Sequence, residues 1–166
     1  MKDLVVIMGV AGSGKTTTGE ALSAATGWPF IEADAHHSDA NRAKMAAGTP
    51  LTDADRVDWV TSISRAVEAA TAPRLVLACS ALTPFVQTAL QDQCGRMVRF
   101  VWLDVPEDLL AQRMTTRPGH FMPVSLLRSQ LDALTVPADV LRMDGTLALT
   151  DLVAGIQQAL PPLASA

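Results

Sequence analysis

The sequence predicts an α/β protein with three layers: a five-stranded parallel sheet covered by helices on both faces. Apolar runs at 4–8, 75–79 and 98–103 are almost uniformly hydrophobic, as expected for strands buried on both faces. These runs alternate with segments of helical periodicity, which favours a parallel sheet. A glycine-rich stretch, GVAGSGKTT, directly follows the first run. In such a sheet, ligands bind at the carboxyl ends of the strands.

Local signals identify further elements. Residues 29–32 and 140–143 are weaker strand candidates. A capping signal at Thr52 begins a helix whose apolar face carries Val60, Ile63 and Val67. Pro106 begins another helix, and residues 149–160 form a last amphipathic helix that is stopped by two prolines. We expect the chain, residues 1–166, to fold as a single domain.

Composition restricts the partners. Hydrophobic residues make up 49% of the chain, its net charge is −4, and it has no lysine- or arginine-rich run, so we expect no nucleic-acid partner. The first apolar run is too short for a membrane span or a signal-peptide core, so we expect no membrane partner and a cytoplasmic location. Cys79 and Cys94 lack metal-type spacing and are expected to be reduced.

The stretch GVAGSGKTT fits the pattern G-x-x-x-x-G-K-[ST], which binds nucleotide phosphates when it lies between a strand and a helix. Its glycines let backbone N–H groups turn toward a phosphate, and the helix N-terminus adds partial positive charge. Lys15 supplies a full charge to the β- and γ-phosphates, and the Thr16 hydroxyl can bind Mg²⁺. We therefore predict ATP and Mg²⁺ as cofactors, held by Gly12, Ser13, Gly14, Lys15, Thr16 and Thr17.

Other nucleotide-binding classes lack their signatures in this sequence. A GTPase needs D-x-x-G on a later strand and N-K-x-D; no strand run carries or is followed by D-x-x-G, and N-K-x-D is absent. A motor-type ATPase needs a carboxylate at the end of a strand, but the run at 75–79 is followed by Ser80. Asp104 is the nearest candidate, and we interpret it as a loop or helix-capping residue. The pattern indicates a small kinase of metabolites or nucleotides.

The polar segment 32–59 is the expected binding region of the second substrate. Asp34 lies just past the carboxyl end of a strand, across from the glycine-rich loop. A carboxylate there can accept the proton of a substrate hydroxyl and orient its oxygen toward the γ-phosphate. We predict that Asp34 and Lys15 are catalytic; the alternative for Asp34 is a helix cap.

Four segments resemble the gluconate kinase family: MGVAGSGKTT at 8–17, N-x-x-K-M-x-x-G-x-P-L-T-D-x-D-R-x-x-W at 41–59, CSAL at 79–82, and R-P-G-H-F-M-P-x-x-L-L-x-S-Q at 117–130. They follow the family's order and span nearly the whole chain. The resemblance implies a P-loop kinase fold, often a homodimer, that uses ATP to convert D-gluconate to 6-phosphogluconate. An ATP-binding regulatory protein with little turnover is the alternative from another class.

The resemblance also implies substrate-binding residues. EADAHHS at 32–38 occupies the place of the family's D-G-D-x-L-H-P, so Asp34 matches its second acid and His37 its histidine. Carboxylates and imidazoles suit the hydroxyls of a polyol, and cations suit its carboxylate. For Lys44 and Arg56, ion pairing with nearby aspartates is the alternative. The implied set is Asp34, His37, Lys44, Asp53, Arg56, Ser80, His120 and Gln130.

Residues 113–128 have the features of a small helical lid. Arg113 and Arg117 lie one turn apart at the end of a helix, before a Pro-Gly break. Arginines on such an arm can neutralise charge on the transferred phosphoryl group while the lid excludes water. We expect both arginines to bind ATP and Arg117 to be catalytic; compensation of the helix dipole is the alternative.

The chain departs from the family pattern where cations are expected. After CSAL it carries Thr83, Pro84 and Gln87 in place of a basic helix start. A charge-assisted hydrogen bond contributes about 1.5–3 kcal/mol, so losing one weakens the binding of an anionic substrate about tenfold or more. Three explanations are open. Arg56, Lys44 or the lid binds the substrate carboxylate instead. Alternatively, the substrate is another hydroxylated acid (shikimate-like) or an uncharged polyol, or catalysis is impaired.

Overall fold

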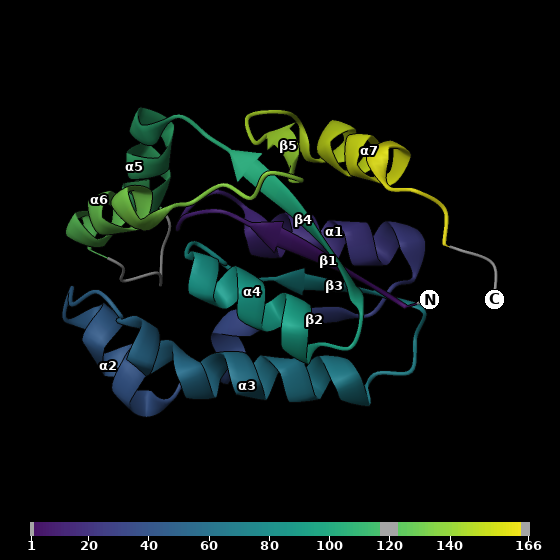
Figure 1. Cartoon of the computed structure of the whole chain (residues 1–166). Helices are drawn as coiled ribbons and strands as arrows, with labels where there is room; N and C mark the ends of the chain where they lie inside the picture. Colours follow the sequence, from purple (N-terminus) through teal and green to yellow (C-terminus); the bar gives the residue numbers. More distant parts are fainter. Residues whose placement is uncertain (1, 117–122, 164–166) are drawn as a thin grey trace.

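Five parallel strands form one sheet in the computed structural model, which describes residues 2–116 and 123–163 (Figure 1). Their order across the sheet is β2-β3-β1-β4-β5, and every neighbouring pair is parallel. The predicted sheet is confirmed, including its two weaker strands. The strands are β1 (Asp3–Met8), β2 (Phe30–Glu32), β3 (Arg74–Ala78), β4 (Met97–Asp104) and β5 (Leu141–Asp144).

Helices cover both faces of the sheet (Figure 1). One face packs against α1 and α7, and the other packs against α3 and α4. None of the helices within the described residues is long and apolar enough to cross a membrane. The helices are α1 (Lys15–Thr26), the 3-10 helix η1 (Ala33–His36), α2 (Asp39–Ala46), α3 (Asp53–Ala69), α4 (Pro84–Gln93), α5 (Glu107–Thr116), α6 (Val124–Ala133) and α7 (Leu149–Ala159).

The central strand β1 shows why the predicted strands are apolar on both sides. Val5 and Ile7 pack toward α1 and α7, whereas Leu4, Val6 and Met8 pack toward α3 and α4. All five side chains are fully buried. Because successive residues of a strand point to opposite faces, a strand between two helical layers has no polar face.

The capping signal at the start of α3 forms as predicted. The Thr52 hydroxyl accepts a hydrogen bond from the Asp55 backbone at 3.3 Å, and the Asp55 carboxylate accepts one from the Thr52 backbone at 2.9 Å. This reciprocal pair satisfies two backbone N–H groups that the helix cannot satisfy itself. Val60, Ile63 and Val67 then face the core, as expected.

An ionic cluster joins the strands at the amino-terminal end of the sheet. The Asp3 carboxylate accepts hydrogen bonds from Arg74 at 2.7 Å and from Arg99 at 3.0 Å. Arg74 also donates to the Pro161 carbonyl at 2.8 Å and lies 4.8 Å from the ring centroid of Trp28. The Asp3 and Arg74 side chains are only 5% and 4% exposed. Burial raises the pKa of Asp3, but the hydrogen bonds from both arginines outweigh it and hold that pKa below its ordinary value.

Both cysteines are buried, and neither forms a disulfide. Cys79 follows β3 and Cys94 follows α4. Burial raises the pKa of the Cys79 thiol to about 12. Burial also raises the pKa of Cys94, although a hydrogen bond to Ser64 acts in the opposite direction. Both thiols are therefore protonated at neutral pH.

Candidate active site

The glycine-rich loop connects β1 to α1 at the carboxyl edge of the sheet. Gly12 and Gly14 have φ angles of 79° and 94°, left-handed values that favour glycine. A Cβ at Gly12 would also lie 3.4 Å from the carbonyl oxygen of Leu110 in α5. The loop therefore needs glycine at both positions in order to bring the N-terminus of α1 into the site.

Two pockets flank this loop. The larger, about 580 Å³, includes Lys15 of the loop and residues of η1, α2 and α3. The smaller, about 490 Å³, extends from the loop to the segment after β5 and to α7, and contains Thr17, which we predict binds nucleotide. Gly12, Gly14 and Arg113 line both pockets. Ligands in the two pockets can therefore meet at the loop.

A carboxylate at the end of β2 joins the loop to η1. The Thr16 hydroxyl donates a hydrogen bond to Glu32 Oε2 at 2.5 Å, and the backbone N–H of Asp34 donates to Glu32 Oε1 at 3.2 Å. Lys15 Nζ donates to the Val10 carbonyl at 3.1 Å. Glu32 is not among the site residues predicted from the sequence. The one feature of the sequence that could have indicated a role for Glu32 is its position at the end of a strand, because ligands bind at that edge of the sheet.

Asp34 lies in η1 and lines the larger pocket together with Lys15, so the structure brings two of the three predicted catalytic residues to one pocket. The residue is exposed. The caps of η1 and α2 are supplied by Glu32 and Ser38, so neither helix uses the Asp34 side chain as its cap. Contact of the Asp34 carboxylate with a substrate stays a prediction.

His37 lines the same pocket and stacks on Trp59, with ring centroids 4.5 Å apart and planes 7° from parallel. The indole N–H of Trp59 donates to the Ala33 carbonyl at 2.8 Å, which fixes the ring on which His37 stacks. Burial lowers the pKa of His37 and is the largest influence on it. The imidazole is therefore neutral at pH 7 and can exchange hydrogen bonds with a hydroxyl group.

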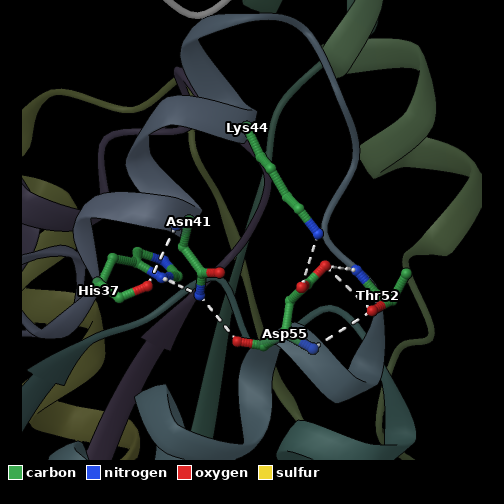
Figure 2. A network of polar contacts seen from close by, with 6 residues as sticks. His37, Asn41, Lys44, Thr52 and Asp55 are labelled. Carbon is green, nitrogen blue, oxygen red and sulfur yellow. Dashed lines mark hydrogen bonds and ion pairs between the residues drawn. The ribbon is translucent and has the colours of Figure 1, made fainter.

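The predicted residues of α2 and α3 divide into two groups. Figure 2 shows Lys44 reaching from α2 to Asp55, with 2.7 Å between Nζ and Oδ1, and Asn41 donating to the Asp55 carbonyl at 2.8 Å. Arg56 pairs with Asp53 at 3.1 Å. Arg56 lines the larger pocket, whereas Lys44 and Asp53 are not among the lining residues of either described pocket. Direct substrate contact by Lys44 and Asp53 stays a prediction.

Side chains of α5 and α6 hold the glycine-rich loop from outside. The Gln130 side-chain oxygen accepts a hydrogen bond from the Ala11 backbone at 2.7 Å. Arg113 donates to the Gly12 carbonyl at 3.2 Å and to the Gly145 carbonyl at 3.3 Å. Gln130, like Ser80, also lines the larger pocket. Two predicted residues thus join the loop to its surroundings.

The predicted lid is described in part. The helix α5 ends at Thr116 and α6 begins at Val124. Arg117, His120 and Phe121 fall between them, outside the described residues. The roles of Arg117 in catalysis and ATP binding, and of His120 in substrate binding, stay predictions.

The uncharged residues at the start of α4 have local partners. Thr83 caps α4 and donates to Asp53 at 3.3 Å. The buried Gln87 side chain donates to the carbonyls of Ala81 at 2.9 Å and Thr135 at 2.7 Å. Gln87 therefore links the loop after β3 to the segment after α6, and this helix start brings no cation to the site.

The fold and the site together define a P-loop kinase, with a phosphate-binding loop after the central strand and a second pocket beside it. A family model described as an AAA domain matches residues 4–137. The gluconokinase of Gluconobacter oxydans is 43% identical over 148 residues, which cover 85% of this chain and 82% of that protein.

Solved structures agree with this assignment. A gluconokinase from Sinorhizobium meliloti has a TM-score of 0.82 and 39% identity, with 94% of this chain and 92% of that chain covered. A sugar kinase from Janibacter has a TM-score of 0.87 and 38% identity, with 95% and 94% covered. The chain belongs to the gluconokinase family.

Proposed function

We propose that this protein transfers the γ-phosphoryl group of ATP to the 6-hydroxyl of D-gluconate, giving 6-phosphogluconate and ADP. The observation that carries the proposal is the meeting of two pockets at one glycine-rich loop. The smaller pocket suits the nucleotide, and the larger contains the residues that suit a hydroxylated acid. The gluconokinases among its relatives support the same acceptor.

The nucleotide half of the proposal depends on charge around the loop. Backbone N–H groups of residues 12–17 and the N-terminus of α1 favour the negative phosphate chain. Lys15 adds a full charge beside the β- and γ-phosphates. Arg113 lines both pockets and can offset phosphate charge between them. Leu147 and Leu149 in the smaller pocket offer apolar surface for the base.

Asp34 is the proposed base for the acceptor. Its carboxylate takes the proton of the hydroxyl as the bond from that oxygen to the γ-phosphorus forms and the bond from phosphorus to the bridging oxygen of ADP breaks. The neutral imidazole of His37 and the hydroxyl of Ser80, both in the larger pocket, bind the other hydroxyls of the acceptor. Gln130 lines the same pocket and is a further proposed contact of the acceptor.

The residues around Thr16 fit Mg²⁺. The Thr16 hydroxyl and the Glu32 carboxylate are hard oxygen groups and lie 2.5 Å apart. Among the described residues, no cluster of three or more His, Cys, Asp or Glu could hold a metal by itself. Mg²⁺ bound with phosphates and water needs only one or two protein ligands. When bound, the ion would neutralise charge on the β- and γ-phosphates.

The proposal includes several further assignments. Arg117 stabilises charge on the transferred phosphoryl group, and His120, Lys44 and Asp53 contribute to acceptor binding. Residues 1–166 form one kinase domain with a lid at 113–128. The protein works in the cytoplasm, as a homodimer.

A coupled ADP-release assay tests the proposed acceptor. The panel contains D-gluconate, other aldonates, shikimate and nucleoside monophosphates, each with Mg·ATP. We expect D-gluconate to give the highest kcat/KM. Stimulation by shikimate or a nucleoside monophosphate in preference to gluconate would assign another acceptor. Tight ATP binding without stimulation by any compound would identify an ATP-binding regulatory protein instead.

A further inference from the structure

The larger pocket carries an excess of positive charge. Its lining includes the cations Lys15, Arg42, Arg56 and Arg113, whereas Asp34 is the one carboxylate among the described lining residues. The chain as a whole has a net charge of −4. A local excess of cations in an acidic protein indicates anionic ligands.

The four cations belong to opposite sides of the pocket. Lys15 is the first residue of α1, directly after the glycine-rich loop, and Arg113 donates to the Gly12 carbonyl of that loop. Arg42 comes from α2 and Arg56 from α3, the two helices that follow η1. The phosphates of the nucleotide account for the first pair. In the second pair, Arg56 is partly neutralised by Asp53 at 3.1 Å, so Arg42 is the cation there that a negative group on the acceptor would complement.

The guanidinium group of Arg42 is anchored to backbone carbonyls of the segment that follows Asp34. Its Nε donates to the His37 carbonyl at 3.2 Å, and its Nη2 donates to the Ala35 carbonyl at 3.3 Å. Both carbonyls follow Asp34 in the chain, one within η1 and one at its C-cap. Within the described residues, Nη1 of Arg42 has no hydrogen-bond partner. One edge of the group is thus fixed by the protein while donors remain for a ligand.

The charges of both arginines act on the imidazole of His37. The pKa of His37 is lowered first by burial; the charge of Asp34 then raises it, and the charges of Arg42 and Arg56 lower it further. Both guanidinium groups and the Asp34 carboxylate therefore lie within electrostatic reach of His37. A hydroxylated acid bound there would meet a base, a neutral hydrogen-bonding group and two cations.

We propose that Arg42, together with Arg56, binds the carboxylate of the acceptor and so distinguishes an aldonate from an uncharged polyol of the same length. The start of α4 offers only Thr83, Pro84 and the internally bonded Gln87, so it cannot supply this charge. The proposal rests on the proposed function, because it takes the acceptor to be a sugar acid. Arg42 contacts the end of the acceptor away from the reacting hydroxyl, so it acts on KM more than on kcat.

Arg42→Gln and Arg42→Lys test the assignment. The assay measures kcat and KM for D-gluconate and for the uncharged D-glucitol with Mg·ATP, and equilibrium binding of both compounds with a non-hydrolysable ATP analogue. We expect Arg42→Gln to raise KM and Kd for gluconate at least about tenfold, leaving KM for ATP and the weak binding of glucitol unchanged. Arg42→Lys should recover part of the loss, since it restores charge without the planar fork.

Arg65→Gln is the matched control, because it removes one arginine charge from an exposed position of α3 that does not line either pocket. It should leave the kcat, KM and Kd values for both compounds, and the KM for ATP, unchanged. An unchanged gluconate KM and Kd in Arg42→Gln would overturn the assignment, and so would an equal loss for gluconate and glucitol. Wild-type protein that binds gluconate without phosphorylating it would overturn the proposed function alone, since binding still tests Arg42. Wild-type protein that does not bind gluconate would overturn both.

Discussion

Replacing Asp3 with asparagine tests the ionic cluster at the amino-terminal end of the sheet. The substitution keeps the shape of the side chain and removes the charge that pairs with Arg74 and Arg99. Because the Arg74 side chain is 4% exposed, water cannot replace its lost partner. Removing one member of a buried pair costs about 3–5 kcal/mol. Arg74 keeps its contacts with the Pro161 carbonyl and the Trp28 ring, so we expect the free energy of unfolding to fall by about 3 kcal/mol.

Thermal and urea denaturation measure this loss. In a chain of this length, 1 kcal/mol changes Tm by about 2–4 °C, so Tm should fall by about 6–12 °C. Asp58→Asn makes the same charge change at an exposed position of α3 and should stay within about 0.5 kcal/mol of the wild type. A loss below about 1 kcal/mol in Asp3→Asn would refute the reasoning from burial.

The same cluster predicts a pH dependence of definite sign. The pKa of Asp3 is lower in the folded protein than its ordinary value of about 3.9. The stabilisation is therefore fully present above that value and is lost as the pH falls through the lower pKa of the folded state. The difference in unfolding free energy between wild type and Asp3→Asn should be constant near neutral pH and shrink below about pH 4. Urea titrations across this range measure it, and a difference that grows with acidification would contradict the assignment.

Two further substitutions test the reaction chemistry. Asp34→Asn should lower kcat by about 10²–10⁴-fold, the usual contribution of a positioned base, and leave ATP binding unchanged. Steady-state kinetics with an ATP titration measures both quantities. An unchanged kcat would remove Asp34 from the mechanism. Glu32→Gln should raise the Mg²⁺ concentration needed for half-maximal activity by about 10–100-fold without changing KM for gluconate, because Glu32 accepts the hydrogen bond of the Thr16 hydroxyl. A Mg²⁺ titration of activity decides this, and no change in the requirement would exclude a supporting role for Glu32.

The elements with the strongest hydrophobic periodicity could be predicted from sequence. The run at 4–8 is buried on both faces as β1, and the capping signal at Thr52 begins α3. By contrast, α2 has no apolar stripe to reveal it, since Asn41 is its only residue classed as buried. Short polar helices of this kind are fixed by tertiary contacts, here by Asn41 and its bond to the Asp55 carbonyl.

The roles of individual charged residues depended on geometry that sequence does not contain. The alternative of ion pairing that the sequence left open for Lys44 and Arg56 is present in the structure for both. Arg42 has no sequence signal, because its position in the pocket follows from two backbone carbonyls of the preceding turn. Glu32 resembles any residue at a strand end until the Thr16 hydroxyl is placed against it.

Because Cys79 and Cys94 are buried, the reactivity of their thiols reports on local unfolding of the protein. A thiol reacts with alkylating reagents as the thiolate, and burial both raises the pKa of each thiol and shields it from the reagent. Modification therefore has to wait for a fluctuation that exposes β3 or the end of α4. The labelling rate in dilute reagent consequently follows the population of opened molecules, with no foreign probe attached.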